Sequence, residues 1–161
     1  MEDHRDMTKI LFVCHGNICR SPMAEYILKD LVKKRRIEQD FVISSCATST
    51  EEIYGGVGNP VYPPAKEQLR RHGISCEGKR AVLLKKSDYD KYDLIIGMDR
   101  MNMRNMQRIL GGDPQGKLHL MKDYTTGGEV SDPWYSGDFE TAYNEIYEAC
   151  EALLTAVLSG I

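Results

Sequence analysis

The chain has 161 residues, of which 42% are hydrophobic, and its formal net charge is −3. This length suits one domain with a single core, and the acidic balance excludes a global basic field that would recruit nucleic acid. No apolar run approaches the about 20 residues that cross a bilayer, and the charged N-terminal stretch MEDHRDMTK lacks the apolar centre of a signal peptide, so we expect a cytoplasmic protein with no membrane partner.

The predicted elements begin with a compact apolar run at residues 9–14, which is typical of a buried strand. Ser21 and Pro22 then predict the cap and first residue of a helix that continues to residue 34. Residues 41–47 predict a second strand, and the turn-rich stretch 48–63 predicts a loop.

The same alternation continues through the second half of the chain, which contains no repeat, linker or low-complexity tract. The predicted elements are a helix at 64–73 with Gly73 just past its end, a third strand at 92–98, a helix at 100–110, a fourth strand at 116–121 and a helix at 139–158 capped by Asp138.

Strand–helix alternation predicts a single α/β domain over residues 1–161. We expect a doubly wound four-stranded parallel sheet of order 2-1-3-4, with helices on both faces and right-handed crossovers. In such sheets ligands bind at the topological switch point, which here is the carboxyl end of the first strand.

The stretch CHGNICRS, residues 14–21, lies at that point and has the composition of an anion cradle. Backbone N–H groups that curl into a helix N-terminus favour an anion; Gly16 permits the curl and Asn17 tolerates a left-handed conformation. Arg20 presents a planar fork that binds two phosphate oxygens. This setting favours the thiolate of Cys14, a nucleophile aimed at phosphorus, to which Ser21 can donate a hydrogen bond.

A general acid is also needed, and the loop after the fourth strand supplies Asp132 at the same edge of the sheet. Pro133 stiffens this loop, and Trp134 and Tyr135 give it aromatic walls. The alternative is that Asp-Pro is only a turn, which is the commoner meaning of the dipeptide.

The stretch VCHGNICRSPMAE together with the distal DPWY resembles the low-molecular-weight protein tyrosine phosphatases, and ATSTEEI, GNPVYPPA, LRRHGI and YDLIIGMD extend the similarity over nearly the whole chain. The resemblance implies metal-free, cofactor-free hydrolysis of phosphotyrosine through a cysteinyl-phosphate. Cys14 would be the nucleophile, Arg20 the phosphate clamp and transition-state stabiliser, and Asp132 the general acid and later base.

The resemblance also implies supporting roles around the loop. Ser21 would assist the thiolate, and Asn17 would hold the loop's strained shape, supported by His72. A histidine in the last turn of a helix is, however, often only a partner of the helix dipole. Asp99 would lie near the loop, with a cap for the helix that follows as an equal and compatible alternative. The remaining members of the implied phosphate-binding loop are His15, Gly16, Ile18 and Cys19.

The chain departs from the family's pattern at the pocket rim. Glu51 stands where members often carry an aromatic residue, and the inserted residues 54–57 bring Tyr54, which we expect to take over that wall. His15 replaces an apolar residue and is expected to be a solvent-facing spectator.

The five cysteines show neither zinc spacing nor a disulfide framework, so no metal site is predicted. Family members often carry a cysteine at position 19, and oxidised Cys14 could be captured by Cys19 as a reversible disulfide. Cys46 and Cys150 are expected in the core, and Cys76 has no evident partner.

Three alternatives stay open. An arsenate reductase would need relay cysteines, for which only Cys76 is placed, and a phosphoarginine phosphatase would typically have a small threonine at position 18. A non-catalytic phosphotyrosine-binding or redox module is the third. Ile18, Trp134 and Tyr135 fit a phenyl ring better, so phosphotyrosine-containing proteins are the expected partners of a monomer or weak dimer.

Overall fold

Four parallel strands form the central sheet in the order β2-β1-β5-β6, namely Phe41–Ala47, Thr8–Cys14, Leu94–Gly97 and Leu118–Leu120. These are the second, first, third and fourth predicted strands, so the predicted order is confirmed. The computed structural model describes residues 7–160; the outermost residues of the predicted domain, 1–6 and 161, lie outside that range.

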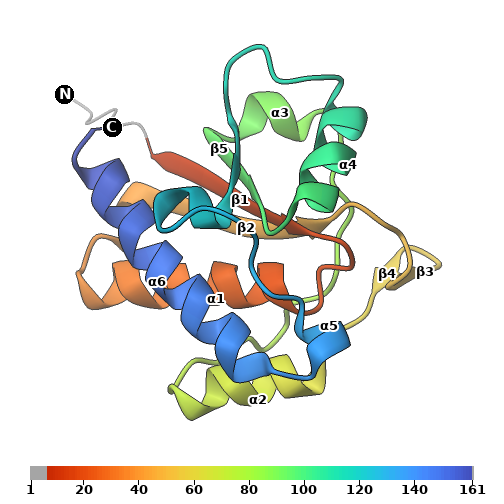
Figure 1. Cartoon of the computed structure of the whole chain (residues 1–161), viewed down its shortest axis with the longest axis vertical. Helices are drawn as coiled ribbons and strands as arrows, with labels where there is room; N and C mark the ends of the chain where they lie inside the picture. The colour runs from red at the N-terminus through yellow and green to blue at the C-terminus, as the bar shows by residue number, and fades with distance from the viewer. Residues whose placement is uncertain (1–6, 161) are drawn as a thin grey trace.

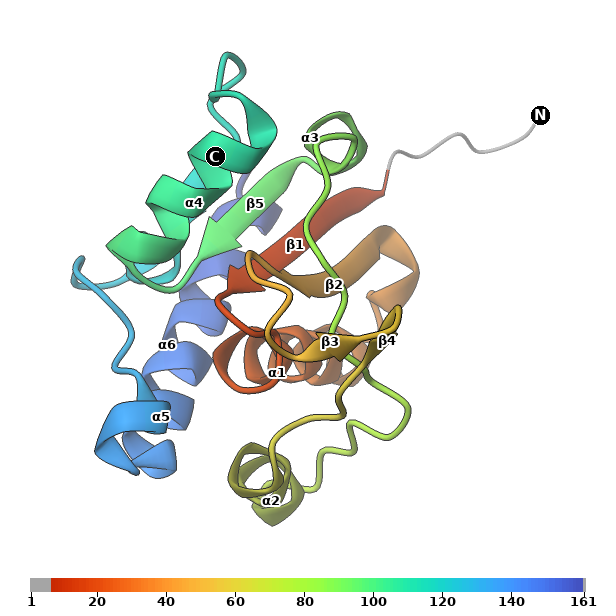
Figure 2. The same cartoon turned by 90° about the vertical axis from the view of Figure 1, so that its right-hand side faces the viewer.

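Helices cover both faces of the sheet, as Figures 1 and 2 show. Successive strand residues point to opposite faces. Ile10 and Phe12 of β1 therefore join one core cluster and Leu11 and Val13 the other. The first cluster packs against α1 (Arg20–Lys34), α2 (Pro63–Arg71) and α6 (Phe139–Leu158), and the second packs against α3 (Asp88–Lys91) and α4 (Arg100–Leu110).

Two predicted helix ends agree with the structure and one is wrong. Asp138 caps α6 by accepting a hydrogen bond from Thr141 N at 2.9 Å, and Gly73 follows α2 with a φ of 74°. However, α1 begins at Arg20 rather than at Pro22, and its N-cap is Cys19, not Ser21. The Ser21 hydroxyl is engaged at the Cys14 sulfur and is not available to cap the helix.

The loop predicted at residues 48–63 contains a small hairpin of β3 (Ile53–Tyr54) and β4 (Val57–Gly58). A side chain at Gly58 would place its Cβ 1.9 Å from the carbonyl oxygen of Ala81, so only glycine allows this close approach. Strands of two residues are too short to give a period in the sequence.

The other short elements also escaped prediction. They are two 3₁₀ helices, η1 (Glu38–Asp40) and η2 (Met121–Tyr124), the four-residue α3, and α5 (Pro133–Ser136). Within residues 7–160, no helix is both long enough and apolar enough to cross a membrane.

Candidate active site

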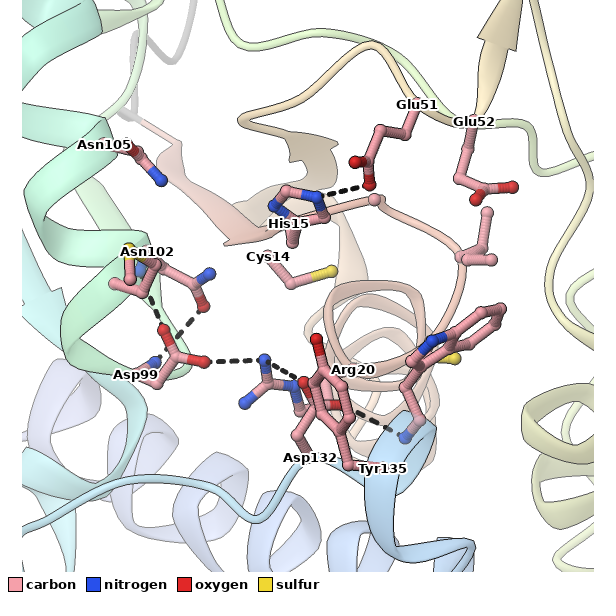
Figure 3. Close-up of a pocket in the computed structure, with 15 residues that line it drawn as sticks. Cys14, His15, Arg20, Glu51, Glu52, Asp99, Asn102, Asn105, Asp132 and Tyr135 are labelled. Atoms are coloured by element: carbon pink, nitrogen blue, oxygen red, sulfur yellow. Dashed lines mark hydrogen bonds and ion pairs between the residues drawn. The ribbon is translucent and has the colours of Figure 1, made fainter.

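A pocket of about 610 Å³ opens at the carboxyl edge of the sheet, where β1 and β5 end and α5 begins. Figure 3 shows the side chains that converge on it. Its lining residues are Cys14, His15, Gly16, Ile18, Cys19, Arg20, Glu51, Glu52, Asp99, Met101, Asn102, Asn105, Asp132, Trp134 and Tyr135.

The Cys14 sulfur lies at the end of β1 and is held in an anion-favouring setting. Its Sγ accepts a hydrogen bond from the backbone N–H of Asn17 at 3.3 Å and lies 3.0 Å from the hydroxyl oxygen of Ser21. Asn17 adopts a φ of 59°, the left-handed conformation that the sequence predicted, and this conformation turns the loop around the sulfur. A thiolate here is supported by donors on two sides.

Arg20, in the first turn of α1, is fixed by three acceptors from two other segments, the start of α4 and the loop before α5. Its Nη1 donates to the carbonyl of Val130 at 2.9 Å, and its Nη2 donates to Asp99 Oδ2 at 2.7 Å and approaches Asp132 Oδ2 at 3.4 Å. Burial alone lowers the pKa of Arg20, but Cys14, Asp99 and Asp132 raise it and prevail. The guanidinium is therefore a fixed cation beside the nucleophile.

Asp132 lies at the pocket, as the sequence predicted, and it also begins a turn, which is the alternative meaning of the Asp-Pro pair. Its Oδ1 accepts a hydrogen bond from Trp134 N at 3.1 Å, so the Asp-Pro pair begins the short helix α5. Its Oδ2 faces Arg20, and a third of the side chain is exposed to the pocket mouth. The carboxyl group of Asp132 therefore lines the same pocket as Cys14 and Arg20.

Asp99 lies beside the loop and also caps the helix that follows it, and both positions were predicted. Besides binding Arg20, it accepts a hydrogen bond from Asn102 N at 2.8 Å, and Asn102 Oδ1 accepts in return from Asp99 N at 3.2 Å. This reciprocal capping box begins α4. The start of α4 is thus tied directly to the guanidinium of the loop.

The side chain of Asn17 is held by partners that differ from the predicted one. Its Nδ2 donates to Ser21 Oγ at 2.8 Å and to Ser45 Oγ at 2.9 Å, and its Oδ1 accepts from Val82 N at 3.1 Å. Ser45 was not predicted from the sequence, although a small polar residue in an apolar strand beside residues 9–14 was the available signal.

The prediction that His72 supports Asn17 is wrong. The His72 ring stacks on Tyr143 of α6, with 4.1 Å between ring centroids, and the residue is exposed at the end of α2. A histidine in the last turn of a helix faced the neighbouring helix instead of the loop.

The pocket rim differs from the prediction at two positions. His15 faces solvent as predicted, but it is not a spectator, because its Nε2 lies 2.6 Å from Glu51 Oε2. Tyr54 is 67% exposed on the hairpin and does not line the pocket. Its expected place is taken by Glu52, whose Oε1 accepts a hydrogen bond from Asn59 Nδ2 at 2.9 Å.

Residues of α4 form a wall that the sequence analysis also missed, made of Met101, Asn102 and Asn105. In Figure 3 the two asparagines lie across the pocket from Glu51 and Glu52. The fold brings Trp134 and Tyr135 to the mouth as predicted, and Trp134 packs on Tyr62 with ring centroids 4.9 Å apart.

Comparison with known proteins shows which family has this arrangement of residues in its sequence. Residues 9–159 match the family described as low molecular weight phosphotyrosine protein phosphatase. The chain belongs to this family. The predicted family and enzyme class are therefore confirmed: the protein is a phosphotyrosine phosphatase, a phosphoric monoester hydrolase.

The similarity to individual relatives extends over nearly the whole length of the phosphatase. Low molecular weight protein-tyrosine-phosphatase YfkJ of Bacillus subtilis is 37% identical over 154 residues, which are 94% of this chain and 96% of the relative. The crystal structure of YfkJ aligns with a TM-score of 0.88 at 34% identity, over 98% of this chain and 99% of that one.

Two further relatives come from animals. The low molecular weight phosphotyrosine protein phosphatase of Gallus gallus is 36% identical over 155 residues, 92% of this chain and 95% of the relative. The crystal structure of DARP, a Drosophila arginine phosphatase, aligns with a TM-score of 0.81 at 32% identity, over 93% of this chain and 98% of that one.

The phosphatase's cysteines fall into two groups. Cys14 and Cys19 line the pocket, whereas Cys46, Cys76 and Cys150 are buried in the core clusters. Burial, followed by the nearby Cys14 and Asp132, raises the pKa of Cys19 to about 12, so Cys19 is a protonated thiol at neutral pH. In the part of the chain that the structure describes, no three His, Cys, Asp or Glu side chains are grouped to hold a metal ion.

Proposed function

We propose that the phosphatase hydrolyses phosphotyrosine in proteins through a phosphate ester on Cys14, without a metal ion. The observation that carries this proposal is the meeting of three groups in one pocket: the Cys14 sulfur with the Asn17 N–H aimed at it, the fixed guanidinium of Arg20, and the carboxyl group of Asp132. These are a nucleophile, an electrostatic clamp and a proton donor.

In the first step the Cys14 thiolate attacks phosphorus, forming the S–P bond as the P–O bond to tyrosine breaks. Arg20 and the loop N–H groups bind the phosphoryl oxygens, on which negative charge is concentrated. Protonated Asp132 gives its proton to the departing phenolate oxygen, so neutral tyrosine leaves.

In the second step a water molecule attacks phosphorus and the S–P bond breaks. Asp132, now a carboxylate, takes the proton from that water, which restores its acid form. The electron pair of the S–P bond returns to sulfur, and Ser21, 3.0 Å away, donates a hydrogen bond to the leaving thiolate. Inorganic phosphate is released.

The walls of the pocket support an aromatic phosphoester. Ile18 and Trp134 offer apolar surface beside the loop, and Tyr135 lies at the mouth. Partners are therefore phosphotyrosine-containing proteins, and five free cysteines favour a reducing, cytoplasmic setting.

Phosphoarginine is the second candidate substrate, because a relative of this chain is named an arginine phosphatase. Glu51 and Glu52 at the rim would also face the cationic group of such a substrate. The arsenate reductase alternative lacks support, since the three cysteines other than Cys14 and Cys19 lie in the core clusters.

A substrate panel tests the proposal. Phosphotyrosine, phosphoserine and phosphoarginine peptides of one sequence are hydrolysed with and without EDTA. We expect phosphotyrosine to have the highest kcat/KM and EDTA to have no effect. Faster hydrolysis of phosphoarginine would overturn the substrate assignment, loss of activity in EDTA would overturn the metal-free mechanism, and binding without turnover would indicate a non-catalytic module.

A further inference from the structure

A buried carboxylate on α1 lies at the far end of a hydrogen-bond chain that leads to the nucleophile. The side chain of Glu25 is 5% exposed. Its Oε1 accepts a hydrogen bond from the hydroxyl of Ser45 at 2.5 Å, and its Oε2 accepts from Lys29 Nζ at 2.6 Å. Lys79 Nζ lies 3.5 Å from Oε1 and donates to the carbonyl of Ser45 at 2.9 Å.

The donor direction along this chain follows from which groups can only accept and which can only donate. A carboxylate only accepts, so the single hydroxyl hydrogen of Ser45 goes to Glu25. The backbone N–H of Val82 only donates, so the Asn17 atom that it meets at 3.1 Å is the amide oxygen. Asn17 Nδ2 must then donate, and Ser45 Oγ must accept.

The second hydrogen of Asn17 Nδ2 goes to Ser21 Oγ, at 2.8 Å. Ser21 therefore accepts from Asn17, and its own hydroxyl hydrogen is free for the Cys14 sulfur at 3.0 Å. A thiolate sulfur only accepts, so in the reactive state Ser21 is the donor. Val82, directly, and Glu25, through Ser45, thus fix the orientation of the Asn17 side-chain amide. In this orientation Asn17 donates to Ser21, which leaves the Ser21 hydroxyl hydrogen for Cys14.

We propose that Glu25 is a positioning residue for Cys14. By accepting from Ser45, it keeps the Ser45 oxygen facing Asn17, which holds Asn17 at its left-handed φ of 59° and aims the Ser21 hydroxyl at the sulfur. Lys79, whose side chain is only 10% exposed, lies 3.5 Å from Glu25 Oε1 and also donates to the carbonyl of Ser45, so it holds Oε1 beside Ser45. This role rests on the proposed function of Cys14 as nucleophile and deepens it.

Other titratable and charged groups also face Cys14 and Glu25, the two ends of this hydrogen-bond chain. Those near Cys14 are Arg20 of α1, Cys19 of the loop and Cys46 of β2, together with the other titratable groups of the pocket, His15, Glu51, Glu52, Asp99 and Asp132. Those near Glu25 are Tyr26 and Lys29 of α1, Cys46 of β2, and Cys76 and Lys79 of the segment after α2. Substitutions that leave these groups in place isolate the hydrogen-bond chain from their charges.

The test is the pH dependence of alkylation of Cys14 by iodoacetamide, located by mass spectrometry within the peptide of residues 10–20. Glu25→Leu removes the acceptor, Ser45→Ala breaks the chain while leaving the ion pairs of Glu25, and Glu25→Gln retains an acceptor oxygen. We expect the midpoint of the first two variants to move up by about half to one pH unit, so that they alkylate about 3- to 10-fold more slowly at pH values below the wild-type midpoint. Glu25→Gln should stay within about twofold of the wild type.

Asp113→Asn is the matched control, because Asp113 likewise accepts a hydroxyl hydrogen bond, from Tyr89 at 2.7 Å, but lies before β6 at the opposite end of the sheet. Its alkylation profile should be unchanged. A wild-type profile in folded Ser45→Ala, or an equal shift in Glu25→Gln and Glu25→Leu, would overturn the proposal. If Glu25→Leu does not fold, Ser45→Ala alone decides.

Alkylation requires no substrate, so the two proposals fail separately. A Cys14 that shows the expected alkylation shifts but hydrolyses no phosphotyrosine would overturn the proposed function and leave the positioning role standing. Full phosphatase activity with unshifted alkylation profiles would overturn the positioning role alone.

Discussion

Arg20 and Asp99 are joined by a 2.7 Å hydrogen bond between a guanidinium that is 4% exposed and a carboxylate that is 19% exposed. The same carboxylate caps α4 through Asn102. One side chain therefore couples the start of α4, on one face of the sheet, to the loop that leads from Cys14 into α1, on the other face, and it helps to orient Arg20.

Asp99→Asn should separate these two functions. Asparagine caps a helix about as well as aspartate, so the free energy of unfolding should change little through the cap. It loses the charged acceptor for Arg20, and a hydrogen bond to a charged group contributes about 1.5–3 kcal/mol, which predicts a fall in kcat/KM of about 10-fold or more.

Asp138→Asn is the control for Asp99→Asn, because Asp138 caps α6 in the same way, by accepting from Thr141 N, and does not line the pocket. Steady-state kinetics and thermal unfolding of both variants give the comparison. Equal activity losses would mean that Asp99 acts only as a cap.

Asp132→Asn should show a loss that depends on the leaving group. The phenol of tyrosine has a pKa of about 10 and needs the proton, whereas an activated nitrophenol needs it much less. General acid catalysis contributes about 10²–10⁴-fold, so phosphoenzyme formation should fall far more on phosphotyrosine than on the nitrophenyl ester. Single-turnover kinetics measure this step directly. Equal losses would make Asp132 a loop-holding residue and Asp99 the next candidate acid.

Mild peroxide should inactivate the enzyme reversibly through Cys19. Peroxide converts the Cys14 thiolate to a sulfenic acid, and the Cys19 thiol then displaces water to form a disulfide. Because burial raises the pKa of Cys19 to about 12, Cys14 rather than Cys19 should react first. Dithiothreitol should restore activity in the wild type and largely fail in Cys19→Ser. Full recovery in that variant would make Cys19 a packing residue only.

Charge at the rim should influence which phosphopeptides are preferred. Glu51 is largely exposed beside Glu52 at the mouth, so a peptide with arginine next to phosphotyrosine should have a higher kcat/KM than one with glutamate. Exposed ion pairs contribute about 0.2–1 kcal/mol, or about 1.4- to 5-fold, and salt should weaken the preference. Glu51→Gln should reduce it, since this change removes a carboxylate and releases His15.

Glu148→Gln, on the exposed surface of α6, is the control for Glu51→Gln. Its peptide preference should match that of the wild type. A preference that is the same in Glu51→Gln and the wild type would place peptide recognition elsewhere on the rim.

The sequence predicted the sheet, its order and the central groups of the site because each rests on local patterns. Buried strands are short apolar runs, and Cys14, Arg20 and Asp132 follow strands whose carboxyl ends share one edge. Parallel topology then brings positions more than a hundred residues apart together, as the 3.4 Å contact between Arg20 and Asp132 shows.

Predictions failed where a side chain's direction depended on tertiary contacts. Ser21 had the local signature of an N-cap, but the tight curl of the loop begins the helix earlier and turns the hydroxyl to the Cys14 sulfur. His72 and Tyr54 are residue types that often serve a functional site. In the structure, however, the His72 ring stacks on Tyr143 of α6, and the Tyr54 ring is exposed on the hairpin. Glu25 looked like an ordinary helix residue, because only the fold brings Ser45 to it.

The central claim is that Cys14 carries the phosphoryl group, and rapid acid quench of the enzyme during turnover of a phosphotyrosine peptide tests it most directly. Mass spectrometry of the peptide containing residues 10–20 should find phosphate on Cys14 within the first turnover, and Cys14→Ser should bind vanadate but show no turnover. Phosphotyrosine hydrolysis with no phosphate on Cys14, or undiminished turnover by Cys14→Ser, would contradict the account.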